Sequence, residues 1–372
     1  MDRKDEIIQL QNKIIESLSR RTLADVRRDL FESPIVPAAA AGAKATEKAA
    51  AAPVKAEPEE TIEDLKKELQ GYTGLSTVKR EVDSLINWIT VGKMRKAHGL
   101  PENELSLHMV FTGNPGTGKT MIARLMARVY KCLGILSKGT LLEVDRSGLV
   151  AGYVGQTAIK TKEAVDKAKG GVLFVDEAYA LTSKGSNDFG AEAVDTLLKA
   201  MEDNRDDLVV IVAGYTELME QFVHSNPGLE SRFNRFIHFL DYTIDEMTEI
   251  FLGRCKKAGY TLDSDADDEL RATLERESKD VDGFGNARGV RNLFELAAAA
   301  QANRLAAVKD PTREMLMALT AQDILDAAER MARYDNPAAQ PGSQLAAALA
   351  ALRDLGAGIG QEIEKNGEPG KA

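Results

Sequence analysis

The run from Gly113 to Thr120 combines the residue types that bind phosphate. It has the pattern G-x-x-x-x-G-K-T and lies between an apolar run at 107–111 and a helical pattern at 121–130. Glycines let successive backbone N–H groups turn toward an anion, and the following helix directs the positive end of its dipole at it. Lys119 would then neutralise the β- and γ-phosphates, and the Thr120 hydroxyl would bind Mg²⁺. The pattern predicts a nucleoside triphosphate site.

Two carboxylates, Asp176 and Glu177, follow a second apolar run at 171–175. Adjacent side chains on a strand point to opposite faces, but at the carboxyl end of a strand both can reach a phosphate crevice. Asp176 would hold Mg²⁺ through its water shell, and Glu177 would position and deprotonate an attacking water. Together with the phosphate loop, these acids indicate hydrolysis rather than binding alone. The predicted nucleotide-binding residues of the two segments are Asn114, Pro115, Gly116, Thr117, Gly118, Lys119, Thr120 and Asp176.

The elements that must position these residues alternate between apolar runs and helical patterns. Runs that fit buried parallel strands occupy 107–112, 140–145, 171–176 and 208–213, and 236–240 fits a fifth strand. Helical patterns separate the first four runs, which predicts βαβ units and a covered parallel sheet. The fold class is therefore α/β.

Helical patterns also precede and follow the predicted sheet. A helix at 62–69, a Gly-Tyr-Thr-Gly turn and a long helix at 78–98 come before it. After it the pattern is helical only. Thr243 and Glu246 form a capping box for the first of these helices, which Gly259 ends. The further helices fit 266–278, 286–308 and 320–333.

The two flanks differ in composition from the middle of the chain. Apolar residues at helical spacing from Ile7 to Leu18 predict an amphipathic helix over 5–31, and an Ala/Pro-rich linker follows. The C-terminal stretch is rich in Pro, Gly and Ala, which is typical of disorder. We predict an N-terminal helix (1–33), a linker (34–60), a nucleotide-binding domain (61–241), a helical domain (242–334) and a largely disordered tail (335–372).

Composition limits the partners and the compartment. The 372 residues carry a net charge of −10, so the chain has no global field that attracts nucleic acid or an anionic membrane. Cys132 and Cys255 lie far apart in helical patterns and suit a reducing cytoplasm. No apolar run reaches membrane-spanning length, and the first residues lack the apolar region of a signal peptide. We expect a soluble, cytoplasmic protein without nucleic-acid partners or membrane insertion.

With both motifs in place, the chain resembles the AAA+ ATPases. More narrowly, it is similar to the group that contains stage V sporulation protein K, the red-type Rubisco activase CbbX and the ATPase component of type VII secretion. The resemblance covers about 62–333. It implies a five-stranded sheet in the order 5-1-4-3-2, a small helical lid domain, and a ring, usually a hexamer, with ATP and Mg²⁺ between subunits. The matching segments are 107–120, 152–157, 171–179, 205–208, 213–215, 225–228 and 286–288.

The resemblance also implies roles for several single residues. Arg232 is similar to the arginine finger that reaches a neighbouring subunit's γ-phosphate, with Arg235 as a second candidate; a surface ion pair is the alternative for either. Arg288 is similar to the lid arginine that reports the nucleotide state, and Arg291 is its rival. Thr216 falls where many AAA+ proteins place a polar sensor, often Asn, so the identity of the sensor stays open.

Two further segments have counterparts in the family. The turn containing Gly74 and Leu75 lies where the family closes over adenine, which implies ATP rather than another nucleotide. The tip with Tyr153, Val154 and Gly155 resembles the pore loop that remodelling rings press against a threaded polypeptide. A glycine-flanked loop presents an aromatic side chain that grips by packing, without reading sequence. The alternative is an ordinary core or turn tyrosine. A second loop, 183–188, either lines the same channel or is simply solvated.

These features favour an ATP-driven motor that remodels or threads a client protein, similar to sporulation protein K. The first alternative is a nucleotide-switched adaptor that recruits a partner through the 5–31 helix, as in a secretion system. A red-type Rubisco activase is a second alternative, which the long N-terminal extension disfavours. A nucleic-acid machine is disfavoured by the acidic charge and the apolar loop tip. The sequence does not name the client.

Overall fold

The computed structural model describes most of the predicted nucleotide-binding and helical domains. The described residues are 60–101, 106–153, 155–182 and 189–335. The predicted N-terminal helix, all but the last residue of the linker, Val154, the 183–188 loop and the tail beyond 335 lie outside them. Among the described residues, no helix is both long and apolar enough to cross a bilayer.

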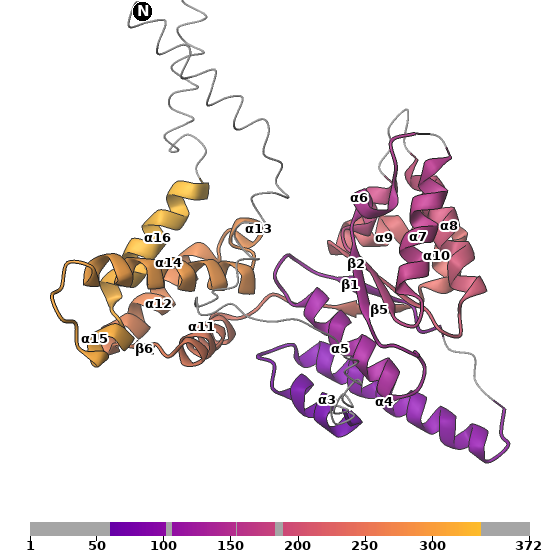
Figure 1. Cartoon of the computed structure of the whole chain (residues 1–372), viewed down its shortest axis with the longest axis horizontal. Helices are drawn as coiled ribbons and strands as arrows, with labels where there is room; N and C mark the ends of the chain where they lie inside the picture. Colours follow the sequence, from indigo (N-terminus) through magenta and orange to yellow (C-terminus); the bar gives the residue numbers. More distant parts are fainter. Residues whose placement is uncertain (1–59, 102–105, 154, 183–188, 336–372) are drawn as a thin grey trace, which may run out of the picture. The chain divides into compact units, whose positions relative to one another are not determined.

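Five parallel strands form one sheet in the order β2-β3-β4-β1-β5 (Figure 1). Read from the other edge this order is 5-1-4-3-2, so the expectation from the family resemblance is confirmed. All strands being parallel, their carboxyl ends lie along one edge of the sheet, where α/β proteins bind ligands. The strands are β1 (Met109–Thr112), β2 (Leu141–Val144), β3 (Val172–Val175), β4 (Val209–Gly214) and β5 (Arg235–His238).

Helices cover both faces of the sheet, and each face has its own apolar core. Phe111, Phe174 and Ile211 belong to a core that α3, α4 and α5 complete. Their strand neighbours, such as Val110 and Leu173, belong to a second core against α7, α8 and α9. The helices are α3 (Ile62–Gln70), α4 (Ser76–Ala97), α5 (Lys119–Cys132), α6 (Arg146–Leu149), α7 (Gln156–Ala168), α8 (Gly190–Asp203), α9 (Thr216–His224) and α10 (Pro227–Arg232), with a 3₁₀ turn η1 (Ala178–Thr182).

The residues after β5 form a mainly helical lid. Its first helix begins at the predicted capping box of Thr243 and Glu246 and ends at Gly259, whose φ is 78°. The prediction of helices only is wrong in one detail, because Thr261–Leu262 (β6) and Ala318–Leu319 (β7) pair in parallel. Two-residue strands are too short to produce a sequence period. The lid helices are α11 (Ile244–Ala258), α12 (Ser264–Glu277), α13 (Val281–Phe284), α14 (Ala287–Leu305), α15 (Arg313–Met317) and α16 (Ala321–Asp335).

Candidate nucleotide site

The phosphate loop joins β1 to α5 at the carboxyl edge of the sheet. Gly113, Gly116 and Gly118 have φ values of 141°, 73° and 97°, which L side chains rarely adopt. A Cβ atom on Gly116 would lie 2.0 Å from the carbonyl oxygen of Gly285 in the lid. The loop therefore depends on glycine twice at this position, for its backbone conformation and for its close approach to the lid.

Gly116→Ala is expected to weaken nucleotide affinity at least about tenfold, because the loop must move away from Gly285 to admit a methyl group. Gly99→Ala is the matched control: Gly99 has a similar φ of 74°, but a Cβ there would meet nothing within 4 Å. The control isolates the cost of the backbone conformation, about 1 kcal/mol of folding stability. Titration with a fluorescent ATP analogue measures both variants. Equal affinities would show that contact with the lid is unimportant.

Lys119 lies inside the loop that it would serve. Its Nζ donates hydrogen bonds to the carbonyl oxygens of Gly113, at 2.7 Å, and Asn114, at 2.8 Å. Burial lowers the pKa of Lys119 despite the attraction of nearby acids, of which Asp176 is the strongest. A partly desolvated cation is stabilised by an anion, so this position fits a bound phosphate. Thr120, on the next position of α5, offers a hydroxyl oxygen to a cation.

Asp176 and Glu177 leave β3 at the same edge. Asp176 donates its backbone N–H to the carbonyl oxygen of Val144, at 2.8 Å, which extends the β2–β3 pairing by one residue. Glu177 has a φ of 49°, a conformation that turns the chain sharply out of the strand. The charges of both carboxylates act on Lys119. The two acids predicted from the sequence are therefore close to the predicted lysine. Asp176 and Thr120 carry oxygen atoms of the kind that Mg²⁺ prefers, so these two residues would hold the ion.

The structure gives Asn114 and Pro115 partners within the protein. Asn114 donates its side-chain amide to both carboxylate oxygens of Asp241, at 3.1 and 2.9 Å. The carbonyl oxygen of Pro115 accepts a hydrogen bond from Asn286, at 3.2 Å. These two predicted nucleotide-binding residues therefore also anchor the loop to the segment after β5 and to the lid.

Gly74 and Leu75 lie against the same region. Both have positive φ values, 63° and 56°, and a Cβ on Gly74 would lie 2.5 Å from a carboxylate oxygen of Glu246. A Leu75 methyl group is 3.8 Å from the position that a Cβ on Gly118 would occupy. The turn predicted to contact adenine is thus next to the phosphate loop and the first lid helix.

Thr216 has a partner that sequence reasoning missed. The Nδ1 atom of His238 lies 3.0 Å from the hydroxyl of Thr112 and 3.4 Å from that of Thr216. The register places Thr112 between Gly214 on β4 and His238 on β5. Since the contact crosses three strands, only the position of His238 at the end of the fifth strand, beside the first, could have indicated it.

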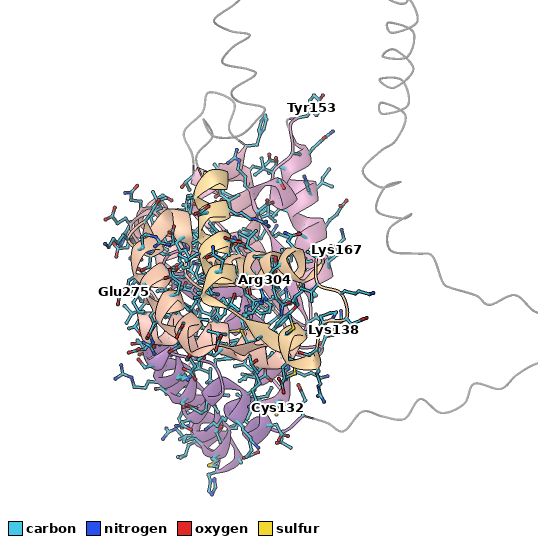
Figure 2. All side chains as sticks on the ribbon, turned by 90° about the vertical axis from the view of Figure 1, so that its left-hand side faces the viewer. Cys132, Lys138, Tyr153, Lys167, Glu275 and Arg304 are labelled. Carbon is cyan, nitrogen blue, oxygen red and sulfur yellow. The ribbon has the colours of Figure 1, made fainter. Side chains whose placement is uncertain are left out.

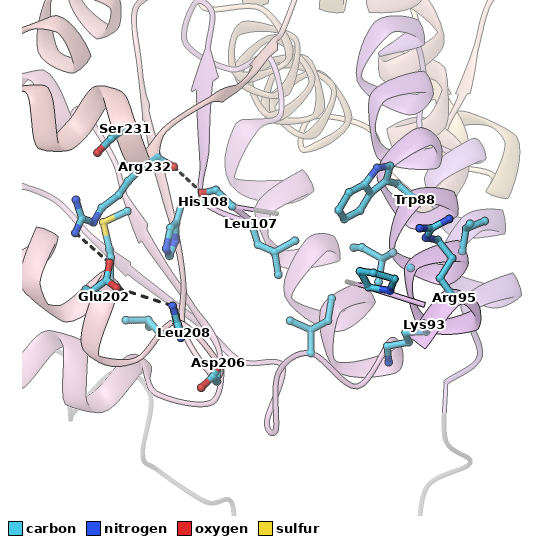
Figure 3. A pocket seen from close by; sticks show the side chains of 18 residues that line it. Trp88, Lys93, Arg95, Leu107, His108, Glu202, Asp206, Leu208, Ser231 and Arg232 are labelled. Atoms are coloured by element: carbon cyan, nitrogen blue, oxygen red, sulfur yellow. Dashed lines mark hydrogen bonds and ion pairs between the residues drawn. The ribbon is translucent and has the colours of Figure 1, made fainter. Parts of the chain in front are cut away.

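Arg232 lies near the amino ends of the strands, whereas the phosphate loop of its own chain lies at their carboxyl ends. It lines a pocket of about 810 Å³ together with His108 and Leu208, which precede β1 and β4. The Ser106 hydroxyl donates to the Arg232 carbonyl oxygen at 2.6 Å, and the guanidinium pairs with Glu202 at 3.2 Å (Figure 3). Arg232 is thus in a surface ion pair in the single chain, and it is placed away from its own Lys119.

The pocket also holds a histidine that the sequence did not single out. His108 is 8% exposed and accepts the backbone N–H of Val210 on Nδ1, at 3.0 Å. Burial, assisted by the charge of Arg232, lowers its pKa to about 4. His108 is therefore neutral at physiological pH, and its Nε2 carries the proton.

Arg235 and the two lid arginines differ in their surroundings. Arg235 opposes the rise in pKa that burial causes at Tyr130 of α5, so its charge acts on a buried side chain of its own subunit. Arg291 pairs with Glu295 on the surface, at 2.7 Å. Arg288 instead lies close enough to Lys119 for its charge to lower the lysine pKa. The structure therefore brings Arg288 to the candidate nucleotide site.

Tyr153 lies in the loop between α6 and α7 and is 73% exposed (Figure 2). The base of this loop is held by α7: Thr157 accepts the N–H of Ala151 at 3.1 Å, and Lys160 donates to the carbonyl oxygens of Ser147 and Val150. A Cβ on Gly155, which follows the tip, would meet nothing within 4 Å. Tyr153 is not a core tyrosine, and its ring stands on an anchored base.

Comparison with known proteins gives the same assignment along most of the described chain. Residues 109–240 match the model of the "ATPase family associated with various cellular activities (AAA)", and residues 243–334 match that of the AAA lid domain. Stage V sporulation protein K of Bacillus subtilis is 39% identical over 266 residues, which are 71% of this chain and 82% of that protein. CbbX of Cereibacter sphaeroides is 44% identical over 247 residues, 66% of this chain and 79% of CbbX.

A third relative carries a named activity. The chloroplastic ribulose bisphosphate carboxylase/oxygenase activase of Cyanidioschyzon merolae is 42% identical over 270 residues, 72% of this chain and 91% of that protein. Each of these relatives is 39% or more identical to this chain over most of its own length, and both the nucleotide-binding part and the lid match a family model. The chain belongs to the AAA+ ATPases, in the group that contains stage V sporulation protein K and CbbX, and it hydrolyses ATP.

Proposed function

We propose that this ATPase assembles as a ring of identical subunits, a hexamer, and uses ATP hydrolysis to pull on a client polypeptide in a central pore. The observation that carries the proposal is Tyr153, 73% exposed at the tip of a loop whose base is fastened to α7. An exposed aromatic ring costs free energy in water unless something covers it. Packing against a client supplies that cover without selecting a sequence.

In the proposed reaction, Lys119 and the loop N–H groups bind the β- and γ-phosphates. Thr120 and Asp176 would hold Mg²⁺, which would supply positive charge beside the phosphates. Glu177 accepts a proton from water as the water oxygen bonds to the γ-phosphorus and the bond to the bridging oxygen of ADP breaks. Thr216, oriented by His238, contacts the γ-phosphate, and Arg288 reports its presence to the lid.

Arg232 is proposed to complete the site of the neighbouring subunit. Arg232 lies near the amino ends of the strands, whereas Lys119 lies near their carboxyl ends, and this separation supports the role. A residue so placed serves its own chain poorly, but head-to-tail packing in a ring brings opposite surfaces together. Arg235, whose charge acts on the buried Tyr130 of its own subunit, is the weaker candidate. Hydrolysis would then depend on assembly.

The residues of the nucleotide site do not identify the client polypeptide. The name of one relative, an activase for ribulose bisphosphate carboxylase/oxygenase, supports a Rubisco-type client as the alternative to a sporulation-type one. An adaptor that recruits a partner without threading is the remaining alternative. Glu177→Gln, with a photo-crosslinking phenylalanine at position 153, would capture the client in the presence of ATP. Recovery of Rubisco or of another polypeptide identifies the client class.

Tyr153→Ala is expected to leave basal ATP hydrolysis within about threefold of the unsubstituted chain and to abolish remodelling of the captured client, because only the grip is lost. Tyr153→Phe is the matched control and should keep both activities, since packing rather than the hydroxyl makes the contact. ATPase turnover and client unfolding, followed by protease sensitivity, measure the two effects. Intact remodelling by Tyr153→Ala would leave the adaptor, which should instead fail when residues 1–33 are deleted.

A further inference from the structure

Asn286, the residue before lid helix α14, joins three segments that are far apart in the sequence. Its Nδ2 atom donates to Asp241 at 2.8 Å and to the carbonyl oxygen of Pro115 at 3.2 Å. Its Oδ1 atom accepts the backbone N–H of Tyr242 at 3.0 Å. Asn286 is only 4% exposed. Both amide protons and the amide oxygen are thus used, by the phosphate loop and by the connection between sheet and lid.

The backbone of Asn286 has a conformation that glycine adopts more easily. Its φ is 54° and its ψ is −129°, a combination that lies outside the regions favoured by L residues. The preceding residue, Gly285, also has a positive φ, 69°. A residue other than glycine that is held in such a backbone conformation must be stabilised by its contacts. Here those contacts are the three hydrogen bonds of the amide.

The carboxylate of Asp241 accepts hydrogen bonds from both the phosphate loop and the lid. Asn114 of the phosphate loop donates to both of its oxygens, at 3.1 and 2.9 Å, and Asn286 of the lid donates to one of them. Hydrogen bonds to a carboxylate are stronger than those between neutral groups. Two amides from different domains therefore share a charged acceptor in the connection between β5 and the lid.

The backbones of the loop and the lid are also in direct contact beside this carboxylate. A Cβ on Gly116 would lie 2.0 Å from the oxygen of Gly285 and 3.0 Å from the nitrogen of Arg288. Arg288 is two residues beyond Asn286, and its backbone N–H donates to Gly285 at 3.0 Å. The position of Arg288 relative to the phosphate loop is therefore set by the same turn that Asn286 holds.

We propose that Asn286 is a positioning residue for ATP hydrolysis: its amide, with Asp241 as the shared acceptor, holds the phosphate loop and Arg288 at the spacing that the reaction requires. The proposal rests on the roles proposed above for the loop and for Arg288. It assigns to Asn286 no contact with the nucleotide itself. A misplacement of about 1 Å in such a group can lower turnover by about 100-fold.

Asn286→Gly tests the proposal, because glycine accepts this backbone conformation while the amide is lost. We expect kcat to fall about 10- to 100-fold, KM for ATP to stay within about threefold, and the melting temperature to shift by less than about 4 °C. Hydrogen exchange at the Tyr242 amide, which loses its acceptor, should accelerate at least about tenfold. An unchanged kcat, or a kcat that falls only in step with the melting temperature, would overturn the proposal.

A swap of the two partners tests whether the hydrogen bond between the side chains of Asn286 and Asp241 carries the effect on turnover. Asn286→Asp loses the donor and places a second carboxylate against Asp241, so kcat should fall as in Asn286→Gly. In the double variant Asn286→Asp with Asp241→Asn, the new amide at position 241 donates to the new carboxylate at 286. We expect kcat to recover at least about fivefold over the single variant. A double variant no better than Asn286→Asp would contradict a role for this pair.

Arg288→Ala, measured in parallel, separates this proposal from the proposed function. If Arg288→Ala loses turnover and Asn286→Gly does not, the positioning role alone is wrong. If Asn286→Gly loses turnover and Arg288→Ala does not, the role assigned to Arg288 is wrong, and Asn286 acts through its bond to Pro115. If both single variants lose turnover, and the double variant Asn286→Gly with Arg288→Ala loses clearly less than the two losses combined, the two residues act as one coupled unit.

Discussion

Glu177→Gln is expected to bind ATP with nearly the affinity of the unsubstituted chain and to hydrolyse it at least about 100-fold more slowly. The amide has the size of the carboxylate but cannot accept a proton from the attacking water. The substitution sits at an exposed position with a φ of 49°, which glutamine can take as readily as glutamate. Single-turnover hydrolysis and fluorescent-nucleotide titration measure the two effects separately.

Lys119→Ala is the companion variant: it should lose nucleotide binding, which Glu177→Gln should keep. It removes the ammonium group that lies within the loop, so we expect most nucleotide affinity to disappear, and hydrolysis with it. Comparing the two variants distinguishes failure to bind from failure to react. Turnover in Glu177→Gln equal to that of the unsubstituted chain would remove Glu177 from the mechanism and would point to another base at this edge of the sheet.

Arg232→Ala is expected to keep ATP binding and to lose turnover by about 1,000-fold or more, the size of the effect known for arginine fingers. The reason is geometric: the guanidinium is beside Glu202 at 3.2 Å, near the amino ends of the strands, and so contributes nothing to its own phosphate loop. The Arg235→Ala variant serves as the control and should retain more activity. Steady-state ATPase assays at saturating ATP give the comparison.

Mixing Arg232→Ala with Lys119→Ala provides the decisive measurement. In rings that exchange subunits freely, about one interface in four pairs an intact pocket with an intact arginine, so up to about a quarter of the activity should return. Neither variant alone has such an interface. If mixtures whose exchange is verified by fluorescence transfer remain inactive, Arg232 does not act between subunits. Its ion pair with Glu202 would then be its whole role.

The local segments of the nucleotide site could be read from the sequence because their chemistry is contiguous. Eight successive residues from Gly113 to Thr120 contain the glycines, the lysine and the hydroxyl, and two acids end one buried strand. The alternation of apolar runs and helical patterns was enough for a covered parallel sheet, since the three inner strands, β1, β3 and β4, are buried at every residue. The strand order came from resemblance to a family rather than from the runs themselves.

The tertiary structure decided which distant residues meet. The resemblance favoured Arg288 and left Arg291, one helical turn further on, as its rival. In the structure Arg288 lies close to Lys119, while Arg291 pairs with Glu295. The contact of His238 with Thr216 depends on β1 lying between β4 and β5.

The sequence by itself determined the ATPase chemistry of this protein, from a phosphate loop and a pair of carboxylates at the end of a buried strand, because the groups within each segment are neighbours along the chain. Only the folded chain showed that Asn286 bonds to Pro115, 171 positions away, and that Arg232 lies at the far edge of the sheet from its own loop. Pairings of this kind depend on strand order and on how helices pack. Local residue patterns do not encode them.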